Sequence, residues 1–397
     1  MRFDFGFYSS LLLITFSQGI VYSFLLLKKG VKTQNYTNYW LSAFIFLCSL
    51  FVAPWMLGFA GWYDNQPYRD ILFYVPFQHL FFIGPLIYFY TQSLLNPSFK
   101  LTKKNFFHLI PGIIYLIYTV WMWIYDKFIV QDYFYYKNGS DKDFDFWYQA
   151  SGFLSMIVYF ILSIRYYSIY KKLIFQISSN ADQLKFEWIR NYLYAFLSMI
   201  TLRVVYDIAS NFFPFLDTYK GAWWFYLSYS IILYYIAITG YSNAVNSKIP
   251  FSVSVLDVKP IALLQSNEEI IIEEADYEIE TEQSDILEWK NKIISLLEVN
   301  PLYNNPELTL NEIARHLQTN ISVVSRAINK GFGLNFNDFI NNYRVEAVKE
   351  CFKNGEHKKS TILGIAFDCG FNSKATFNRA FKKNTGLSPK EFLQKNQ

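Results

Sequence analysis

Residues 361–383 read TILGIAFDCGFNSKATFNRAFKK, and this stretch decides the fold of the C-terminal part of the chain. It opens with apolar residues at three- and four-residue steps, which is typical of an amphipathic helix: Ile362, Ile365 and Ala366. Gly370 permits a tight turn, and Ser373 is a suitable N-cap for a second helix. The inner side of that helix is marked by Phe377, Ala380 and Phe381. The stretch predicts a helix-turn-helix unit.

A second unit of the same kind precedes it. Residues 308–330 read LTLNEIARHLQTNISVVSRAINK, where Asn320 can cap the second helix. The apolar positions of the two helices are Leu310, Ile313, Ala314, Leu317, Val324, Ala327 and Ile328. Between the units, residues 336–354 (FNDFINNYRVEAVKECFKN) predict one long amphipathic helix that sets their separation. The boundaries expected are about 309–330, 336–354 and 361–383.

Several pieces of this region carry a family resemblance. They are LTLNEIA, Tyr343–Arg344–Val345, IAFDCGFNS, FNRAFKKNTG and Leu387–Ser388–Pro389. Together they resemble the AraC/XylS family of bacterial transcription regulators, over residues from about 305 to 390. The resemblance implies two recognition helices in successive major-groove segments on one face of the DNA. The first recognition helix departs from the family pattern, because Val323, Val324 and Ala327 stand where larger residues are usual.

Helix phase predicts which side chains of the two units face away from the core and toward DNA. An arginine can pair with guanine and an asparagine with adenine, whereas lysines more often meet phosphates. Each single residue could instead be an ordinary solvated surface position. The predicted DNA-binding residues are Ser322, Ser325, Arg326, Asn329 and Lys330 in the first unit, and Lys374, Thr376, Asn378, Arg379, Lys382 and Lys383 in the second.

Charge divides the chain into three regions. Residues 1–248 carry 19 Lys+Arg and 12 Asp+Glu, residues 249–285 have a net charge of −9, and residues 286–397 have a net charge of +6. The basic C-terminal region suits a polyanion such as double-stranded DNA. The acidic segment 248–285 is predicted to be a flexible linker, although its alternating Ile and Glu residues could form a short strand.

The N-terminal part, residues 1–247, is apolar and rich in aromatic residues. It contains seven apolar runs of a length that spans a bilayer: 7–27, 36–60, 71–95, 106–126, 147–170, 188–213 and 222–241. Trp and Tyr residues gather near several of their ends, as at membrane interfaces. The fold class predicted for the chain is therefore all-α: a seven-helix transmembrane bundle followed by an AraC-type double helix-turn-helix domain at 286–397. This fusion resembles a group of bacterial regulators that join a membrane sensor to such a domain.

Lysine and arginine residues in the loops predict the orientation. The first, third and fifth loops hold the excess, with Lys28, Lys29, Lys32, Lys100, Lys103, Lys104, Lys171, Lys172 and Lys185. Positive residues favour the cytoplasmic side, so the N-terminus is expected outside and the C-terminal domain inside. The predicted location is the bacterial inner membrane, with a multi-pass topology.

Four polar residues within the spans suggest a sensory pocket. Arg203 and Asp207 are four residues apart on one helix face and can pair, and Gln78 and His79 follow Pro76, which can kink its helix. Charges inside a bilayer usually face a bundle interior or a cavity. The alternative is a structural ion pair and a hydrogen-bonded histidine that hold helices together.

These features favour a membrane-anchored one-component transcription regulator over other classes. No nucleophile–base pair or metal-ligand spacing can be recognised, so neither an enzyme nor a cofactor or metal site is expected, and the three cysteines show no C-x-x-C spacing. The expected partners are DNA, the lipid bilayer and a small-molecule or membrane signal, with a homodimer and RNA polymerase as further candidates. Two alternatives stay open: a passive membrane anchor for the DNA-binding domain, and a transporter-like protein with a DNA-binding tail.

Overall fold

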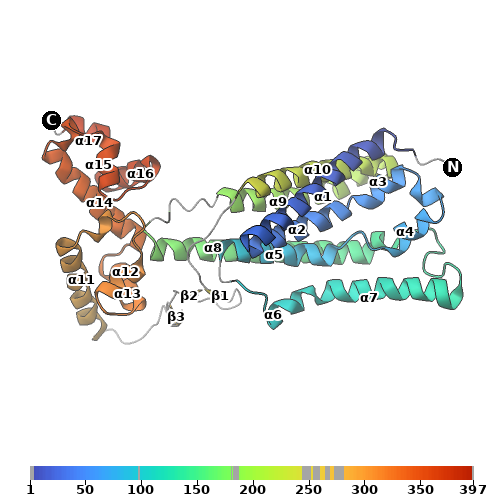
Figure 1. Cartoon of the computed structure of the whole chain (residues 1–397), viewed down its shortest axis with the longest axis horizontal. Helices are drawn as coiled ribbons and strands as arrows, with labels where there is room; N and C mark the ends of the chain where they lie inside the picture. Colours follow the sequence, from blue (N-terminus) through green and yellow to red (C-terminus); the bar gives the residue numbers. More distant parts are fainter. Residues whose placement is uncertain are drawn as a thin grey trace. The chain divides into compact units, whose positions relative to one another are not determined.

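The computed structural model describes residues 4–96, 99–179, 181, 187–243, 252–253, 260–263, 269–271 and 281–395 (Figure 1). The chain divides into two compact units: residues 1–167 with 186–248, and residues 168–185 with 249–397. The division falls within one long helix, α8 (Phe146–Ile177), which therefore contributes residues to both units.

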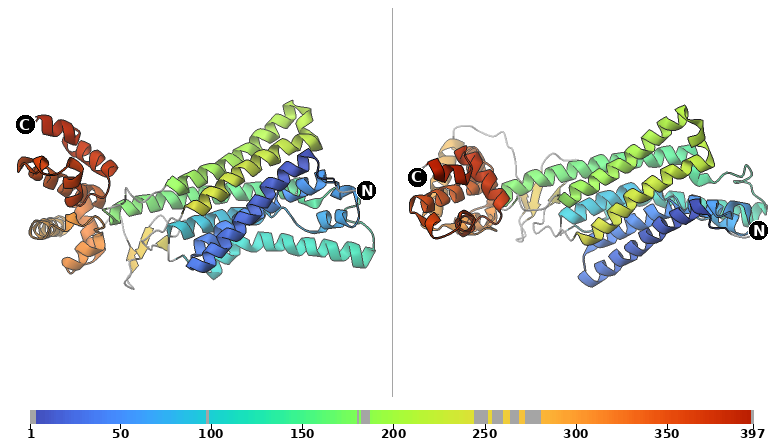
Figure 2. Two further views of the ribbon diagram at one scale, coloured as in Figure 1. Left: turned by 45° about the horizontal axis from the view of Figure 1, so that its top comes forward. Right: turned by 90° about the horizontal axis from the view of Figure 1, so that it is seen from above.

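The first unit is a bundle of helices that run up and down (Figures 1 and 2). The N-terminus, α3 and α4 lie at one end of this bundle, and the connections after α1 and after α5 lie at the other end. Besides α8, its helices are α1 (Phe7–Thr33), α2 (Tyr36–Leu50), α3 (Ala53–Phe59), α4 (Tyr68–Tyr74), α5 (Leu80–Leu95), α6 (Lys103–Phe106), α7 (Ile110–Ile124), α9 (Glu187–Phe212) and α10 (Tyr219–Ser242).

Six helical segments in the described part of the chain are long and apolar enough to cross a membrane. They are Phe7–Thr33, Tyr36–Phe59, Lys103–Val130, Phe146–Ile177, Trp188–Phe212 and Tyr219–Ser242, and they coincide with six of the seven predicted spans. Large apolar side chains are exposed at helical spacing on the outside of this bundle, as lipid contact requires and a water-facing surface does not. Examples are Ile14, Val21 and Phe24 on α1, Ile114, Ile117 and Val120 on α7, and Leu154, Val158 and Ile161 on α8.

The remaining predicted span, 71–95, which is the third in chain order, is not one continuous helix. The count of seven spans is therefore not confirmed. α4 ends at Tyr74, Val75 is extended (ψ 115°), and α5 begins only at Leu80. The residue before a proline avoids the helical region, and Pro76 follows Val75, which explains the break. The 16 residues of α5 cover about 24 Å at ~1.5 Å per residue, less than a hydrocarbon core of about 30 Å. Most of α5 is buried, so its apolar character reflects a place inside the bundle.

Small residues allow the bundle helices to approach closely. A Cβ atom at Gly19 of α1 would lie 2.0 Å from Oγ of Ser49 on α2, and one at Gly152 of α8 would lie 2.5 Å from Cβ of Leu80 on α5. Between α1 and α2, the hydroxyl groups of Ser23 and Ser42 lie 3.1 Å apart and are hydrogen-bonded. Glycine and serine at helix crossings are typical of membrane bundles, where close packing replaces the hydrophobic effect between helices.

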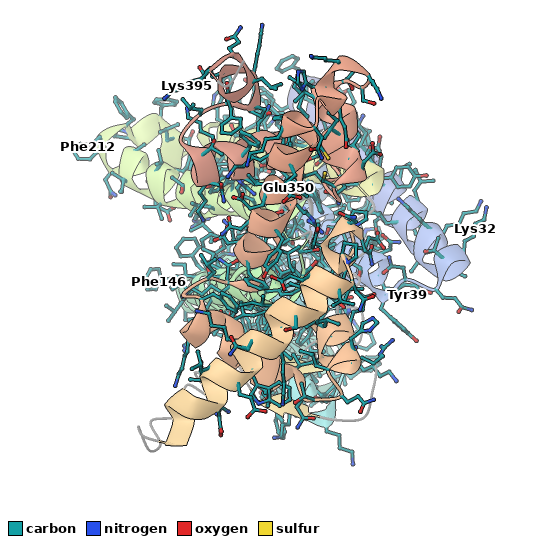
Figure 3. The ribbon with its side chains drawn as sticks, turned by 90° about the vertical axis from the view of Figure 1, so that its left-hand side faces the viewer. Lys32, Tyr39, Phe146, Phe212, Glu350 and Lys395 are labelled. Carbon is teal, nitrogen blue, oxygen red and sulfur yellow. The ribbon has the colours of Figure 1, made fainter. Side chains whose placement is uncertain are left out.

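Besides the C-terminal end of α8, the second unit contains seven α-helices among its described residues. They are α11 (Thr281–Val299), α12 (Leu310–His316), α13 (Ile321–Gly331), α14 (Phe336–Lys353), α15 (Ile362–Asp368), α16 (Lys374–Thr385) and α17 (Pro389–Lys395). Figure 3 shows this unit with its side chains, with Glu350 on α14 and Lys395 at the end of α17. Two separate hydrophobic cores stabilise it, and α14 contributes Phe336, Phe339 and Ile340 to one and Val345, Val348 and Phe352 to the other.

The described residues of the acidic segment 248–285 form three short strands, β1 (Ser252–Val253), β2 (Pro260–Leu263) and β3 (Glu269–Ile271). They form one antiparallel sheet in the order β1-β2-β3, with Ser252 opposite Ile261 and Ile261 opposite Ile271. A short strand was the alternative that the sequence left open here. The rest of the segment predicted as a flexible linker lies outside the described residues, so that prediction remains a prediction.

Candidate nucleic-acid interface and bundle pocket

The first helix-turn-helix unit consists of α12 and α13. Thr309 begins α12 with a capping box: its backbone N–H donates to the Glu312 carboxylate at 2.8 Å, and its side chain accepts from the Glu312 N–H. Gln318 makes the turn with φ 51°, in the left-handed region. Asn320 occupies the N-cap position of α13, but its side chain makes no capping hydrogen bond, so the predicted cap is absent.

The second helix-turn-helix unit consists of α15 and α16. Its turn and its N-cap fit the predicted residues better than those of the first. Gly370 makes the turn with φ 90°, and a Cβ atom there would lie 2.2 Å from the carbonyl oxygen of Tyr303. Ser373 caps α16 as predicted, because its hydroxyl accepts a hydrogen bond from the Thr376 N–H at 3.2 Å. The core of this unit is aromatic, with Phe371, Phe377 and Phe381 in contact.

Arg344 of α14 contacts both helix-turn-helix units. Its Nε donates to the carbonyl oxygen of Tyr303 at 2.7 Å, and Nη2 donates to that of Asn305 at 2.8 Å. Its guanidinium lies 6.0 Å from the ring centre of Phe371, which belongs to the second core. Burial lowers the pKa of Arg344 to about 10, so the side chain still carries its charge at neutral pH. We call Tyr303, Asn305, Arg344, Gly370 and Phe371 the junction.

The outer face of α13 presents fewer side chains than the helix phase predicted. Arg326 and Lys330 are exposed, and Ser322 and Asn329 are half-buried. Ser325 is only 4% exposed, and its hydroxyl accepts a hydrogen bond from Asn329 Nδ2 at 3.3 Å. Ser325 is therefore less accessible than predicted, since helix phase alone does not show what neighbouring elements cover.

The outer face of α16 is more open. Lys374, Asn378, Arg379 and Lys382 are exposed. Thr376 is 6% exposed, and its hydroxyl lies 3.0 Å from that of Ser373, so it belongs to the cap and not to the predicted outer face. Lys383 pairs with Asp338 of α14 at 2.8 Å and keeps 63% of its side chain exposed.

A groove separates α13 from α11. It is lined by Asp285, Ile286, Trp289, Val323, Arg326 and Ala327. Nothing in the sequence indicated that α11 lies beside the first recognition helix. Arg326 thus lines this groove, whereas Arg379 of α16 is not among the lining residues.

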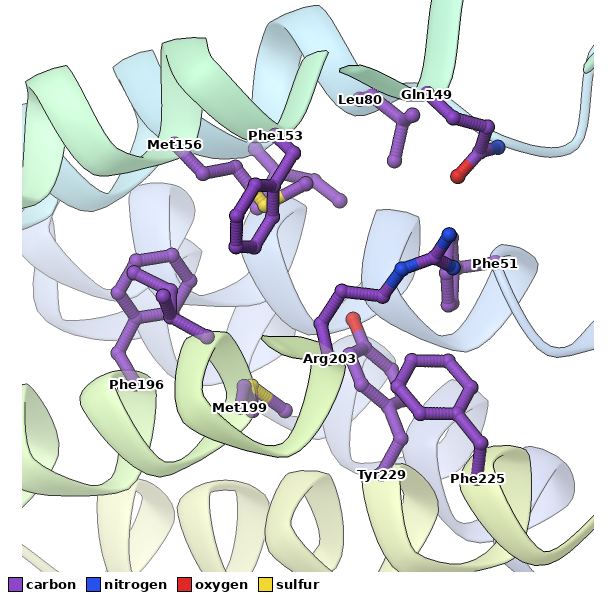
Figure 4. Close-up of a pocket in the computed structure, with 12 residues that line it drawn as sticks. Phe51, Leu80, Gln149, Phe153, Met156, Phe196, Met199, Arg203, Phe225 and Tyr229 are labelled. Carbon is purple, nitrogen blue, oxygen red and sulfur yellow. The ribbon is translucent and has the colours of Figure 1, made fainter. Parts of the chain in front are cut away.

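The N-terminal helix bundle contains a pocket with an empty volume of about 510 Å³, part of it open to the outside (Figure 4). Arg203 extends from α9 into it toward Phe51, and Gln149 reaches in from α8. The other lining residues are apolar or aromatic: Leu80, Ile83, Phe153, Met156, Phe196, Met199, Ile200, Phe225 and Tyr229.

The four polar residues predicted for a pocket are only partly together. Arg203 Nε pairs with Asp207 Oδ2 at 2.9 Å, and Arg203 lines the pocket. Gln78 is fully buried and accepts a hydrogen bond from Gln149 Nε2, which places it one side chain behind the pocket wall. His79 is at the N-cap position of α5, and His79 and Asp207 are not among the lining residues. Sequence reasoning missed Gln149, which lies near the start of the predicted span 147–170.

Asp143, in the connection before α8, supports the break between α4 and α5. Its Oδ2 accepts hydrogen bonds from the N–H groups of Phe77 and Gln78 at 3.0 and 3.1 Å, and its Oδ1 accepts one from the Tyr115 hydroxyl at 2.6 Å. Burial raises the pKa of Asp143, and burial and the nearby Asp143 charge raise that of Asp141 well above its ordinary value. These bonds satisfy backbone groups that the interrupted helix leaves without partners.

The two cysteines near the second helix-turn-helix unit, Cys351 and Cys369, both have raised pKa values. Burial raises the pKa of the Cys369 thiol to about 12 and also raises that of Cys351. A thiol that stays protonated at neutral pH is a poor nucleophile and a poor metal ligand. Within the described ranges, no cluster of three or more His, Cys, Asp or Glu side chains is arranged to hold a metal ion.

Comparison with known proteins finds relatives for the C-terminal part of the chain. Residues 313–395 match the family described as "Helix-turn-helix domain". A stretch of 102 residues is 28% identical to an uncharacterized HTH-type transcriptional regulator from Staphylococcus aureus (strain COL), over 26% of this chain and 13% of that protein. A stretch of 88 residues is 31% identical to the uncharacterized HTH-type transcriptional regulator YtdP from Bacillus subtilis (strain 168), over 22% of this chain and 11% of that protein. This chain thus matches only 11–13% of the length of these curated relatives. No solved structure matches the chain.

Proposed function

We propose that this chain, whose C-terminal part is an AraC-type helix-turn-helix domain, is a membrane-anchored one-component transcription regulator. The observation that carries the proposal is the pair of basic helices α13 and α16, each held by its own helix-turn-helix unit and joined by the single helix α14. Two such helices at a fixed separation suit two successive major-groove segments of double-stranded DNA.

Exposure and chemistry divide the side chains of these helices by role. Arg326 and Arg379 would contact guanines, and Asn329 and Asn378 adenines, because these pairings match the hydrogen-bond pattern of the major groove. Lys330, Lys374, Lys382 and Lys383 would meet phosphates, and Ser322 can reach either. Ser325 and Thr376 are left out because both are buried.

The bundle would lie in the bacterial inner membrane, with the N-terminus outside and the DNA-binding domain in the cytoplasm. The lysine-rich connection after α1 and the lysine-rich start of α6 lie at the same end of the bundle, opposite the N-terminus, in agreement with the positive-inside rule (Figure 1). Contacts with RNA polymerase and with a second copy of the chain would be further interactions of a DNA-bound regulator.

The pocket around Arg203 and Gln149 would bind the signal, with Gln78, His79 and Asp207 as its supporting polar groups. Its apolar and aromatic wall with a few polar side chains is typical of a small-molecule site. A ligand changes the output only if it binds two states of the bundle with different affinity. A bundle that merely anchors the domain is the alternative that the tests below separate.

The experiment that tests DNA reading uses the full chain in lipid nanodiscs. Genomic fragments that remain bound at a fixed salt concentration are selected and sequenced, because phosphate contacts make affinity depend on salt. The variant is Arg326→Ala with Arg379→Ala, and the charge-matched control is Lys292→Ala with Lys395→Ala, on helices α11 and α17. We expect sites with two short conserved blocks about one helical turn apart. The variant should lose this enrichment and the control should keep it. Equal enrichment by all three proteins, or none by the parent chain, would contradict sequence-specific reading.

The sensing role is tested in cells with a reporter gene behind a selected site. Arg203→Gln is compared with Arg165→Gln, which alters an arginine on α8 that is not among the pocket-lining residues. We expect Arg203→Gln to abolish changes of reporter output between growth conditions while DNA binding of the purified protein is retained. An unaltered response would leave the bundle as an anchor.

A further inference from the structure

The C-terminal end of α8 contacts the DNA-binding domain within the second unit. Ser178 pairs with Thr309 in an isolated antiparallel β-bridge, and the N–H of Ser179 donates to the carbonyl oxygen of Leu308 at 3.1 Å. The two serines are buried, with 6% and 1% of their surface exposed. We call Ser178–Ser179 the docking segment, because it pairs with backbone at the start of the first helix-turn-helix unit.

Side chains of α14 also bind the docking segment. Asn337, which is 1% exposed, donates Nδ2 to the carbonyl oxygen of Ser179 at 2.8 Å. Arg344 donates Nη2 to the Ser179 hydroxyl at 3.0 Å and Nη1 to the Ser179 carbonyl oxygen at 3.4 Å. Asn341 extends the network by donating to Oδ1 of Asn337 at 3.0 Å. Buried polar groups require such partners, so the docking segment supplies acceptors that these α14 side chains need.

The guanidinium that binds the docking segment is the one that forms the junction. Arg344 donates hydrogen bonds to the carbonyl oxygens of Tyr303 and Asn305 and lies over the ring of Phe371. It therefore connects the first helix-turn-helix unit, α14 and the second helix-turn-helix unit. Removing Ser179 from this network would take acceptors from a buried charge, and hydrogen bonds to charged groups are among the stronger ones. The separation of α13 and α16 would then be held less firmly.

α8 also lines the bundle pocket. Gln149, Phe153 and Met156 of this helix are pocket residues, and the docking segment follows directly after its last residue, Ile177. α8 is therefore the covalent connection between the pocket and the docking segment.

We propose that the surface formed by Asn337, Asn341 and Arg344 on α14 is a docking site for Ser178–Ser179 of the same chain, and that an occupied site favours binding to DNA with two recognition blocks. Docking completes the hydrogen bonds of the junction and so fixes the spacing of the two recognition helices. Movement of α8 on signal binding withdraws the segment and lowers DNA affinity. The DNA readout rests on the proposed function, whereas the contact itself can be tested without it.

The contact is tested by disulfide cross-linking of Ser178→Cys with Thr309→Cys in the full chain in nanodiscs. Residues opposite each other in an antiparallel pair have Cβ atoms about 4.5–5.5 Å apart, close to the range that a disulfide bridges after a small adjustment. A protease site inserted between Ser266 and Asn267 lets the two halves separate on a gel unless the disulfide joins them. The controls are Ser178→Cys alone and Lys172→Cys with Thr309→Cys, where Lys172 is an exposed residue of α8.

We expect the halves to stay joined in most molecules of the Ser178→Cys, Thr309→Cys variant, and to separate in the controls and after reduction. A yield no higher than that of the controls would overturn the docking site. This result does not depend on whether the protein binds DNA.

The consequence for DNA is tested with a double-mutant cycle in the full chain. We expect Ser179→Ala and Asn337→Ala each to weaken binding to a two-block site about five- to tenfold, since each removes hydrogen bonds of the same buried network. The double variant should lose about as much DNA affinity as the single variant with the larger loss, because the effects of groups in one network are not additive. Lys172→Ala is the control and should bind like the parent.

The outcomes of the two experiments separate the proposals. If the parent chain binds no DNA, the proposed function fails, and the cross-link still decides the docking site. If the parent binds DNA but both single variants bind equally well or more tightly, or if their effects add, the docking site does not favour DNA binding and the inference is overturned.

Discussion

The two helix-turn-helix units follow one plan but are held together differently. The second unit has Gly370 in its turn, a working Ser373 cap and an aromatic core. In the first unit Gln318 takes the left-handed position of the turn, Asn320 makes no capping bond, and the core is mostly aliphatic.

The first unit gains from its neighbours what it lacks locally. Ile293 and Leu297 of α11 belong to its core, and its first backbone residues pair with the docking segment. The second unit is stabilised mainly by its own residues and by α14. The difference teaches that the helix-turn-helix unit with weaker local signals depends more on tertiary contacts with the rest of its compact unit.

The largest expected effect tests the aromatic core of the second unit. Phe381 is fully buried, and Phe381→Ala should lower the free energy of local unfolding by about 3–5 kcal/mol, since it removes a large side chain and leaves a cavity. Val324→Ala in the first unit, also fully buried, should cost less because fewer methyl groups are lost. Hydrogen exchange of α16 and α13 amides in the full chain measures both. Equal losses would remove the contrast between the cores.

The two turns should respond to substitution with opposite signs. Gly370→Ala places a methyl group against the Tyr303 carbonyl at φ 90° and should destabilise α15 and α16 by roughly 2–4 kcal/mol. Gln318→Gly relieves a left-handed non-glycine residue and should change the stability of the first unit by less than about 1 kcal/mol, toward higher stability. Thermal unfolding followed by hydrogen exchange checks both, and a stabilising Gly370→Ala would show that the turn does not rest on Tyr303.

The recognition helices should differ in how their arginines act on DNA. Arg379→Ala should lose about 1–3 kcal/mol of discrimination at one base pair of the second block, and Arg326→Ala the same or less in the first block, because Arg326 also lines the groove with α11. Binding assays with sites mutated one base pair at a time measure the discrimination. A uniform loss over all sequences would indicate a phosphate contact instead.

The smallest expected effect concerns the caps. Ser373→Ala should cost about 1 kcal/mol, because it removes the acceptor of the Thr376 N–H. Asn320→Ala should cost close to nothing, because no capping bond is lost. Hydrogen exchange at the first turns of α16 and α13 compares them directly. Equal costs would mean that Asn320 caps α13 in solution.

Much of the helical architecture could be predicted from local patterns. The helices around Ile362–Ala366 and Phe377–Phe381 follow from apolar residues at three- and four-residue steps, and six long apolar segments follow from length and composition. The burial of Ser325 and Thr376 could not be predicted, because helix phase gives the direction of a side chain but not what covers it. The single helix expected at 71–95 failed since an apolar run can belong to a buried, interrupted helix as well as to a span.

The sequence by itself determined the two helix-turn-helix units, the helix that joins them and the apolar character of the N-terminal part. These depend on interactions between residues three or four apart, which the chain order specifies. Only the tertiary structure decided that Arg203 and Gln149 share one pocket, that α11 lies beside α13, and that Ser179 meets Arg344. Ser179 and Arg344 are separated by 165 residues, and a polar contact across such a distance leaves no periodic trace, because its energy depends on geometry that many elements fix together.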